Sequence, residues 1–433
     1  MSHLIWGGAD CVDLARAYGT PLYVVDETII RARCREIQNT FLSRWSATSV
    51  CYAGKAFLTL AMARIMEQEG LGLDVVSGGE LLVAQKAGFP MSRVELHGNA
   101  KSERELRAAL SLGVGRVIVD GIMELEVLSA LADELEKDVN IMIRVSPGVN
   151  PHTHSHLVTG HLGSKFGLPL EGELLRNAVC LAVTSKHVHL KGFHFHVGSQ
   201  IFEPDFHVES VRRVVALVDK LQKEYGIATD ELNFGGGFGV GQMPDGAPGI
   251  KGEPHVPVAL FTDAMMSALT QECEARALSR PAVVIEPGRW IIGTAGITLY
   301  NVETIKRLDG VTYIGVDGGM PDNPRPSLYS APYRAVLANK TDDAQLENVS
   351  IAGKCCETGD ILIQSELLPS SVKRGDILAV FNTGAYNFSM ATNYNRLGRP
   401  ALVFVKDGAS YIAAYRRTEE DLLQGEVVPE ILR

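Results

Sequence analysis

Between residues 49 and 289 the sequence alternates between short apolar runs and longer helical patterns, and this alternation constrains the fold more than any other feature. The eight apolar runs are 49–56, 71–77, 93–99, 116–121, 140–146, 190–199, 231–237 and 282–289. Buried parallel strands have this composition because both of their faces are covered. The segments with apolar residues three and four apart are 58–70, 79–88, 102–113, 123–137, 171–185, 206–226 and 261–277. Eight strands alternating with amphipathic helices predict a (β/α)8 barrel of the TIM type.

From about residue 290 to 418 the pattern changes to runs of alternating apolar and polar residues separated by turn residues. These runs include 312–317, 348–353, 376–381, 401–407 and 410–417. They predict an antiparallel β domain, either a sandwich or a barrel. An apolar strand at 21–27 has no partner in the barrel pattern, so we expect it to join that β domain. We therefore predict a barrel over 30–289 and a β domain formed by 1–29 and 290–433.

Composition excludes several classes of protein. The net charge of −10 argues against a nucleic-acid-binding surface, which needs a basic face. No apolar stretch of about 18 residues predicts a membrane span, and the first residues do not resemble a signal peptide. Seven scattered cysteines without a CxxC pair indicate free thiols in a reducing cytoplasm and no structural zinc site.

Polar or glycine residues follow most of the predicted strands. They are Lys55, Asp74 to Ser77, His97 to Asn99, Arg144, His196 to Ser199, Gly235 to Gly237 and Glu286 to Arg289. Catalytic groups of such barrels lie at the C-terminal ends of the strands. A purely structural barrel does not need ionisable groups at most of these ends, so the pattern predicts an enzyme.

Each candidate also has a plain structural interpretation. Lys55 could extend its amine to the barrel rim, or its amine could form a Schiff base in a pocket that depresses the pKa. The glycines from Gly235 to Gly237 follow the seventh strand, where barrels commonly bind phosphate through backbone N–H groups. Glu286 could form a structural salt bridge or hold a pyridine nitrogen protonated. His194 and His196 could pack, bind a metal or stack on a cofactor.

Two further candidates lie in the predicted β domain. Cys356 and Glu357 belong to the sequence Gly-Lys-Cys-Cys-Glu-Thr-Gly-Asp. A buried cysteine usually acts as a small hydrophobic residue. A carboxylate beside the thiol in a turn favours a functional cysteine only modestly.

Together these segments resemble the fold-type III pyridoxal-phosphate decarboxylases, and within them the branch that acts on meso-2,6-diaminopimelate. The resemblance runs over nearly the whole chain. Its motifs are YAGKAF (52–57), EGLGLDVVSGGEL (69–81), KFG (165–167), HFHVGSQ (194–200), NFGGGFG (233–239), EPGR (286–289), DGGMPDNPRPSLY (317–329), CCETGD (355–360) and GAYNFSMATNYN (384–395). The order and spacing of these motifs make the resemblance specific.

The resemblance implies a role for each candidate. Lys55 would carry pyridoxal 5'-phosphate as a Schiff base, His196 would stack on its ring, and Glu286 would pair with the pyridine nitrogen. The residues around the phosphate would be Ser199, Gly235, Gly236, Gly237, Gly288, Arg289 and Tyr386. Cys356 would return a proton to the substrate's α-carbon from the partner subunit of a homodimer, so the active site would be shared.

The resemblance also implies the substrate. Arg289, Arg325 and Tyr329 would bind the distal carboxylate of meso-2,6-diaminopimelate, with Tyr386 nearby, and Glu357 would receive its distal ammonium. The product would be L-lysine, and the reaction would be the last step of lysine biosynthesis. Carboxynorspermidine, lysine, ornithine or a secondary-pathway amino acid remain alternative substrates. The chain departs from the usual pattern of this branch at Phe57, Ser146, Lys354 and Asn387.

Three other functions match parts of the sequence. A metal-dependent barrel hydrolase is suggested by His152, His154, His156 and His161 and by the pair of His194 and His196. That class assigns no role to Lys55 or to the EPGR motif, so we expect no metal. A decarboxylase-like regulator without catalysis usually lacks the lysine or the acid, whereas Lys55 and Cys356 are both present. A racemase is disfavoured because a carboxylate at the pyridine nitrogen suits decarboxylation.

Overall fold

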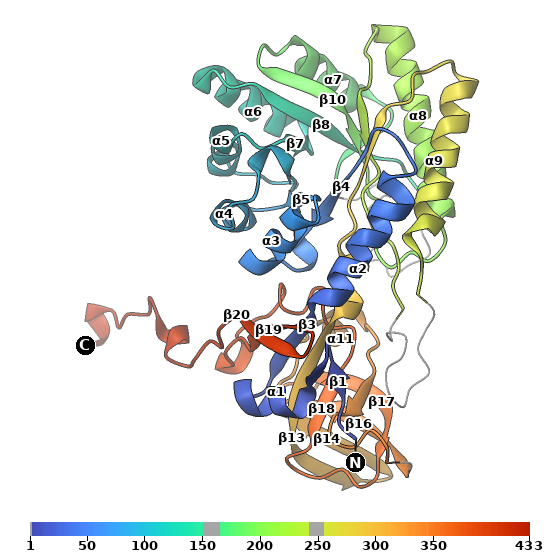
Figure 1. The fold of residues 1–433 in the computed structure, drawn as a ribbon. Helices are drawn as coiled ribbons and strands as arrows, with labels where there is room; N and C mark the ends of the chain where they lie inside the picture. The colour runs from blue at the N-terminus through green and yellow to red at the C-terminus, as the bar shows by residue number, and fades with distance from the viewer. Residues whose placement is uncertain (1, 150–164, 242–254, 344) are drawn as a thin grey trace. The chain divides into compact units, whose positions relative to one another are not determined.

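The computed structural model describes residues 2–149, 165–241, 255–343 and 345–433 (Figure 1). The chain forms two compact units. The barrel unit comprises Arg31–Val240 and Val256–Ile291, and the β unit comprises Met1–Ile30, Gly241–His255 and Ile292–Arg433.

The barrel unit contains the predicted closed sheet of parallel strands. In spatial order its strands are β10 (Val188–His194), β11 (Glu231–Asn233), β12 (Ala282–Ile285), β4 (Thr48–Ala53), β5 (Gly72–Val75), β6 (Val94–Leu96), β7 (Arg116–Val119) and β8 (Val139–Ser146). Parallel pairing between β8 and β10 closes the ring. Every neighbouring pair is parallel, so the predicted (β/α)8 barrel is confirmed. A short strand, β9 (Leu168–Pro169), extends β8.

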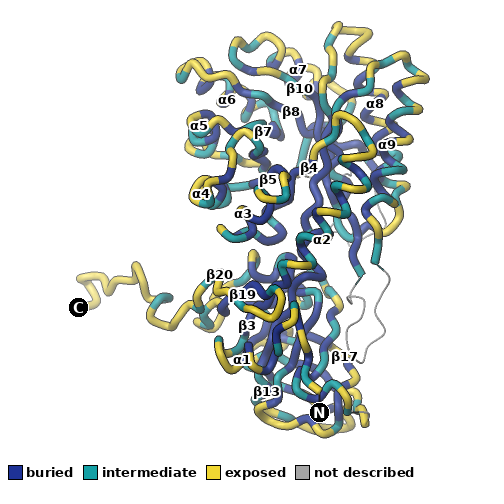
Figure 2. The backbone as a smooth tube through the Cα atoms, in the orientation of Figure 1, coloured by how far each residue is buried: buried dark blue, intermediate teal, exposed yellow. Residues whose placement is uncertain are grey.

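Helices surround the barrel strands, and exposed and buried residues alternate along them, as the yellow and dark blue segments in Figure 2 show. They are α3 (Leu60–Gln68), α4 (Gly78–Lys86), α5 (Glu103–Leu112), α6 (Ile122–Leu135), α7 (Glu173–Thr184), α8 (Asp205–Tyr225) and α9 (Val258–Ala275). Local chemistry sets several of their ends. Ser102 and Glu105 form a capping box at α5, and Gly113 and Gly226 end α5 and α8 in the left-handed region. A four-residue helix, α10 (Arg289–Ile292), follows β12.

The β unit contains a second large sheet, which is mostly antiparallel as predicted. Its main path is β17 (Ile361–Pro369), β16 (Leu346–Ala352), β14 (Val311–Val316), β13 (Gly296–Leu308), β3 (Leu22–Asp26), β19 (Ala401–Lys406) and β20 (Ala409–Ala414). Off this path, β18 (Ile377–Val380) pairs with β13 and with β15 (Ala335–Leu337). Two pairs are parallel, β14 with β16 and β3 with β19. The N-terminal strand β3 thus lies between β13 and β19.

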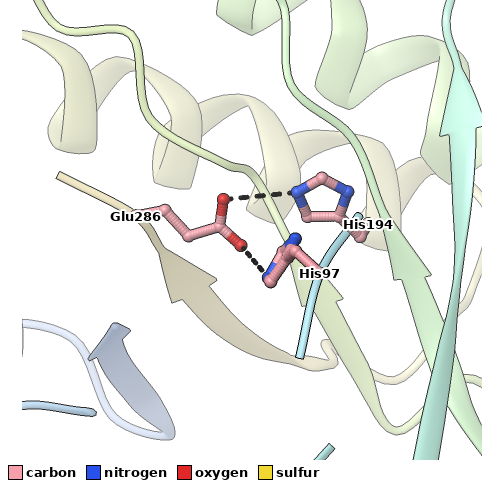
Figure 3. Close-up of side chains that lie close together, drawn as sticks. All are labelled: His97, His194 and Glu286. Carbon is pink, nitrogen blue, oxygen red and sulfur yellow. Dashed lines mark hydrogen bonds and ion pairs between the residues drawn. The ribbon is translucent and has the colours of Figure 1, made fainter. Parts of the chain in front are cut away.

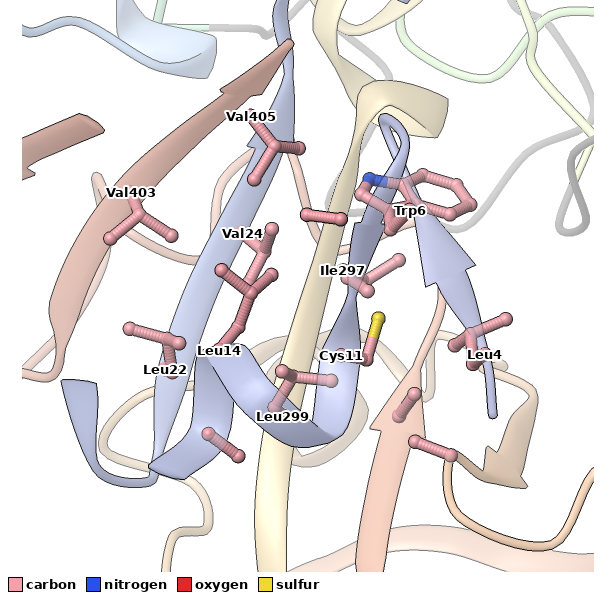
Figure 4. Close-up of a cluster of buried hydrophobic side chains, with 14 of the residues drawn as sticks. Leu4, Trp6, Cys11, Leu14, Leu22, Val24, Ile297, Leu299, Val403 and Val405 are labelled. Atoms are coloured by element: carbon pink, nitrogen blue, oxygen red, sulfur yellow. The ribbon is translucent and has the colours of Figure 1, made fainter. Parts of the chain in front are cut away.

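Apolar side chains on β3, β13 and β19 pack against the N-terminal residues of the β unit (Figure 4). Leu14 of α1 (Cys11–Tyr18) and Trp6 of the hairpin β1–β2 (Ile5–Trp6 and Ala9–Asp10) cover this cluster. Burying one such side chain contributes about 1.5–3 kcal/mol, so the cluster explains why the first residues belong to this unit. Among the residues described, no helix is both long and apolar enough to cross a membrane.

Candidate active site

Three buried side chains from the C-terminal ends of barrel strands meet inside the barrel unit (Figure 3). Glu286 follows β12, His97 follows β6, and His194 ends β10. His97 Nε2 lies 3.1 Å from Glu286 Oε1, and His194 Nε2 lies 3.3 Å from Glu286 Oε2. The two imidazole rings stand edge to face with their centroids 5.0 Å apart. Each oxygen of Glu286 therefore has an imidazole nitrogen beside it.

Asn233, the last residue of β11, links this group to a second carboxylate. Its side-chain Nδ2 donates to Glu286 Oε1 at 2.7 Å and to Glu95 Oε2 at 3.0 Å. Its Oδ1 accepts the backbone N–H of Gly235 at 2.9 Å. Asn233 thus orients Glu286 and fixes the start of the glycine loop at the same time.

The charges in this group follow from burial and from the neighbours. Burial alone would lower the pKa of His97, but the carboxylates of Asp74 and Glu286 outweigh it and raise that pKa to about 10. Burial lowers the pKa of His194 to about 4 in spite of Glu286. Burial alone would raise the pKa of Glu286, but His97 and His194 hold it well below its usual range. At neutral pH the group is an imidazolium, a carboxylate and a neutral imidazole.

Lys55 lies in the 3₁₀ turn Gly54–Ala56, directly after β4. Burial is the largest effect on Asp74 and raises its pKa to about 6, although the positive charge of Lys55 acts in the opposite direction. Burial and the charge of Lys55 both lower the pKa of His196. Within the described residues, no hydrogen-bond donor reaches either carboxylate oxygen of the fully buried Asp74. A Cβ on Gly288 would lie 2.9 Å from Ala53 Cβ, so a glycine there lets the EPGR segment pack on the lysine turn.

The glycines after β11 bring the backbone against neighbouring main-chain atoms. A Cβ on Gly236 would lie 2.1 Å from the carbonyl oxygen of Glu286, and one on Gly237 would lie 2.2 Å from that of Gly198. Gly235 and Gly237 also adopt positive φ values of 65° and 95°. The segment, called here the glycine cradle, therefore tolerates only glycine, because its main chain packs closely against the segments after β10 and β12.

His196 and Ser199 lie beside this cradle. The N–H of Gly236 donates to His196 Nδ1 at 3.1 Å, which fixes the ring as a neutral tautomer with its proton on Nε2. Burial and the charges of Lys55 and Arg144 hold the pKa of His196 well below its usual range. Arg289 Nη2 donates to Ser199 Oγ at 3.2 Å. The segments after β10, β11 and β12 thus meet at one place.

Arg144, near the end of β8, is buried beside an acidic partner and an aromatic ring. Its Nε lies 3.8 Å from Asp120 Oδ1, and its guanidinium lies 4.4 Å from the ring centroid of Phe166 in the KFG motif. The N–H of Gly167 donates to Asp120 Oδ2 at 3.1 Å. These contacts explain why the KFG motif (165–167) occurs together with Arg144 near the end of β8.

In the β unit a separate group forms around Arg325, at the start of α11 (Arg325–Tyr329). The Arg325 side chain is buried, and its guanidinium lies 5.3 Å from the ring centroid of Tyr329 and 5.5 Å from that of Tyr386. Aromatic faces attract a cation at these distances. Tyr386 has a positive φ of 65°, a strained conformation for a side chain of this size. The predicted Arg325, Tyr329 and Tyr386 are therefore neighbours in the fold.

The loop with Cys356 and Glu357 is tied to α11 by hydrogen bonds within the β unit. Ser327 Oγ donates to the carbonyl oxygen of Gly359 at 2.8 Å. Asp360 accepts the N–H groups of Met320 at 2.6 Å and Cys355 at 2.8 Å. Both Cys356 and Glu357 are exposed, and the N–H of Cys356 donates to Asn395 Oδ1 at 3.0 Å. The loop thus presents these two side chains outward from the unit.

The fold also gathers residues to which the sequence assigned no role. The sequence pattern places Asp74 and His97 only at strand ends, and it assigns no role to Glu95 or to Asn233, the first residue of the NFGGGFG motif. One signal was available, since Glu95 and Asn233 are polar residues inside apolar strands, and a buried polar group needs a partner. The positions that depart from the usual pattern are mostly enclosed: Phe57, Ser146 and Asn387 are buried, whereas Lys354 is exposed.

Four of the histidines that suggested a metal site, His152, His154, His156 and His161, lie outside the described residues. His97, His194 and Glu286 do offer ligand atoms within 4.8 Å of one another. However, a metal would have to displace the proton that the neighbouring carboxylates hold on His97. This group suits a protonated organic ring nitrogen better than a metal ion.

A pyridine cofactor fits these residues. The ionised Glu286 can accept a ring N–H, the glycine cradle and Ser199 with Arg289 can receive a phosphate, and Lys55 supplies an amine near the buried Asp74. The barrel and this set of groups define a pyridoxal-phosphate-dependent enzyme of fold type III.

Comparisons with known proteins agree with that class. Residues 27–293 match the family described as "Pyridoxal-dependent decarboxylase, pyridoxal binding domain". A diaminopimelate decarboxylase of Bacillus subtilis is 43% identical over 98% of this chain and 94% of its own, and one of Staphylococcus aureus is 39% identical over 97% and 96%. The crystal structure of the M. jannaschii diaminopimelate decarboxylase in complex with L-lysine superimposes with a TM-score of 0.90 at 33% identity, covering 98% of this chain and 96% of that one.

The chain therefore belongs to the pyridoxal-dependent decarboxylases, and within them to the diaminopimelate decarboxylases. Its cofactor is pyridoxal 5'-phosphate, and its class of reaction is decarboxylation.

Proposed function

We propose that this enzyme decarboxylates meso-2,6-diaminopimelate to L-lysine and CO2, the last step of lysine biosynthesis. The observation that carries the proposal is the ionised Glu286, held by His97 in a barrel whose first strand leads to Lys55. Relatives named diaminopimelate decarboxylase, and a neighbour that binds L-lysine, support the choice of substrate.

Bound pyridoxal phosphate supplies an electron-withdrawing ring that accepts the electron pair released when CO2 leaves. Glu286 would accept the hydrogen bond of the ring nitrogen and keep that nitrogen protonated. Lys55 would hold the cofactor through its Nζ, and His196 would stack on the ring. The phosphate would be held or surrounded by Gly235, Gly236, Gly237, Ser199, Gly288, Arg289 and Tyr386.

Arg325 distinguishes this substrate from simpler diamino acids. Its buried guanidinium, flanked by Tyr329 and Tyr386, can hold the distal carboxylate of diaminopimelate together with Arg289, and Glu357 can receive the distal ammonium. Ornithine and lysine have only an ammonium at that end. A buried cation there would repel that ammonium and leave itself without a counter-charge.

Cys356 provides the proton that replaces CO2 on the α-carbon. Because its side chain is exposed in its own β unit, we assign it to the active site of a second subunit in a homodimer. We also propose that the chain divides into a barrel domain over 30–289 and a β domain formed by 1–29 and 290–433. A cytoplasmic location is supported by the seven cysteines, none of which forms a disulfide.

The experiment that tests the proposal is a chemical trap combined with a substrate screen. The purified protein should be yellow, and borohydride should attach the cofactor irreversibly to the peptide that contains Lys55. Lys55→Ala is the control and should carry no label. In the screen, meso-diaminopimelate should be turned over far faster than lysine, ornithine or carboxynorspermidine. A colourless, unlabelled protein would end the cofactor assignment, and preference for another substrate would end the diaminopimelate assignment.

Arg325→Ala should raise KM for meso-diaminopimelate by roughly 10- to 100-fold, because a charge-assisted hydrogen bond contributes about 1.5–3 kcal/mol. The Kd of pyridoxal phosphate should change less than about threefold, since the residue is assigned to the substrate. Steady-state kinetics and cofactor titration separate the two effects. Arg334→Ala removes a half-exposed arginine of the same unit, which pairs with Glu366, and serves as the control. Equal losses of substrate and cofactor binding in Arg325→Ala would contradict the assignment.

A further inference from the structure

His207 is a buried histidine of α8 to which the proposed function assigns no role. Its side chain is fully buried, and in the described part of the chain its one hydrogen bond joins Nε2 to the carbonyl oxygen of Gly236 at 3.0 Å. A carbonyl oxygen can only accept, so the imidazole carries its proton on Nε2 and donates to Gly236. Nδ1 has no hydrogen-bond partner among the described residues. The polar contact of His207 is therefore a single bond to the glycine cradle.

Two aromatic rings hold this imidazole in place. The ring centroid of His207 lies 5.5 Å from that of Phe238 and 5.5 Å from that of Phe261 in α9. Burial lowers the pKa of His207 to about 4, so the ring is neutral at neutral pH. Burying an imidazole in such apolar surroundings costs free energy unless its polar atoms find partners. A leucine would avoid that cost, so the hydrogen bond to Gly236 is the property that distinguishes histidine at this position.

The three glycines of the cradle differ in what their N–H groups do. The N–H of Gly235 donates to Asn233 Oδ1 at 2.9 Å, and the N–H of Gly236 donates to His196 Nδ1 at 3.1 Å. Within the described structure, the N–H of Gly237 donates to no protein group. Gly237 is also partly exposed, whereas Gly235 and Gly236 are buried. Of the three, the N–H of Gly237 is the one available to an anion.

The hydrogen bond from His207 sets the direction of that N–H. The carbonyl group of Gly236 and the N–H of Gly237 belong to one planar trans peptide unit, so they point in opposite directions. His207 holds the carbonyl group toward α8, and the N–H of Gly237 therefore points away from α8. His196 holds the N–H of Gly236 at the same time. Histidine side chains thus fix both peptide units that meet at the Cα of Gly236.

We propose that His207 is a positioning residue for the phosphate of the cofactor, because it aims the N–H of Gly237 at that phosphate through the shared peptide unit. The inference rests on the proposed function, which places the phosphate at the glycine cradle. His207 reaches this site only through Gly236 and touches no reacting atom. An N–H that already points in the right direction needs no reordering when the phosphate binds, so less of the binding free energy is lost.

The test compares the Kd of pyridoxal phosphate with the Kd of pyridoxal, which lacks the phosphate, on the full-length protein. His207→Leu removes the donor and keeps an apolar side chain between the two aromatic rings. It should raise the Kd of pyridoxal phosphate about tenfold and that of pyridoxal less than about twofold, because only the phosphate uses the N–H of Gly237. His207→Gln, whose amide can donate to the same carbonyl oxygen, should return the Kd of pyridoxal phosphate to within about threefold of the wild-type value. In phosphorus NMR of the holoenzyme, the resonance of the bound phosphate should shift in His207→Leu and return in His207→Gln.

Ser210→Ala is the matched control. Ser210 is buried in the same helix, and in the described structure its Oγ donates only to the carbonyl oxygen of Phe206 within α8. The change should alter neither dissociation constant. Equal increases of the two constants in His207→Leu, or no increase in either, would overturn the positioning role.

Ser199→Ala separates this inference from the proposed function, because Ser199 is a second group assigned to the phosphate. If Ser199→Ala lowers the preference for pyridoxal phosphate over pyridoxal and His207→Leu does not, the cradle stands and the inference is wrong. If neither variant changes that preference, the phosphate binds elsewhere, and both the cradle assignment and the inference fail.

Discussion

Glu286→Gln should lower kcat by roughly 10²- to 10³-fold, because the amide keeps the shape of the side chain but cannot hold a ring nitrogen protonated. A preorganised charge in a buried site contributes about 3–4 kcal/mol to the transition state. The Kd of pyridoxal phosphate should rise less than about tenfold, since the phosphate cradle is untouched. The substitution also removes one of the three carboxylates, those of Asp74, Glu286 and Glu95, that raise the pKa of His97, so that pKa should fall.

Steady-state kinetics, cofactor titration and NMR titration of His97 measure these three effects. Glu95→Gln is the matched control, because Glu95 is equally buried and shares Asn233 with Glu286. Glu95 reaches Glu286 only indirectly, through Asn233 and through His97, whose Nε2 lies 3.7 Å from Glu95 Oε2, so its loss should lower kcat less than tenfold. Equal losses of kcat in the two variants would show that the network matters as a scaffold and that Glu286 has no special role.

Cys356→Ala should lower the rate of product formation by roughly 10²- to 10⁴-fold, the usual contribution of a positioned general acid. Cofactor binding should be unchanged, because Cys356 lies on an exposed loop of the β unit, whereas the cradle lies in the barrel unit. Product formation and the cofactor's absorbance are measured on the same preparation.

The chain offers a matched control in the neighbouring cysteine. Cys355 is half-buried, its N–H is held by Asp360, and burial with that carboxylate raises its thiol pKa to about 12. Such a thiol releases its proton with difficulty, so Cys355→Ala should change the rate less than about threefold. A larger effect at Cys355 than at Cys356 would reverse the assignment of the acid. Loss of cofactor together with activity in Cys356→Ala would indicate a structural role instead.

The predicted barrel follows from local patterns in the sequence. Strands such as 93–99 and 282–289 are recognisable because a strand buried on both faces must be apolar throughout, and helices such as 206–226 show a 3.6-residue period. Capping residues such as Ser102 and Gly113 then mark helix ends within a few residues. These signals need only neighbours along the chain, so they can be read without a structure.

The pairing of strands in the β unit could not be read in this way. The parallel pairs β3–β19 and β14–β16 join segments that alternate like any antiparallel strand, because periodicity reports burial and not direction. β3 and β19 are also separated by the whole barrel in the sequence. Their association is decided by the core that Leu22, Val24 and Val403 form together.

By itself the sequence determined the barrel, the family and the residues Lys55 and Glu286 as candidates, because strand ends and motifs are local properties. The tertiary structure alone decided that His97, Asp74 and Asn233 surround Glu286. The pairing of β12 with β4, the last and first strands of the barrel, brings together strand ends as far apart in the sequence as Asp74 and Glu286, which are 212 residues apart. Only this proximity sets the ionisation of the group, since the energy between charges depends on their separation in space and on burial.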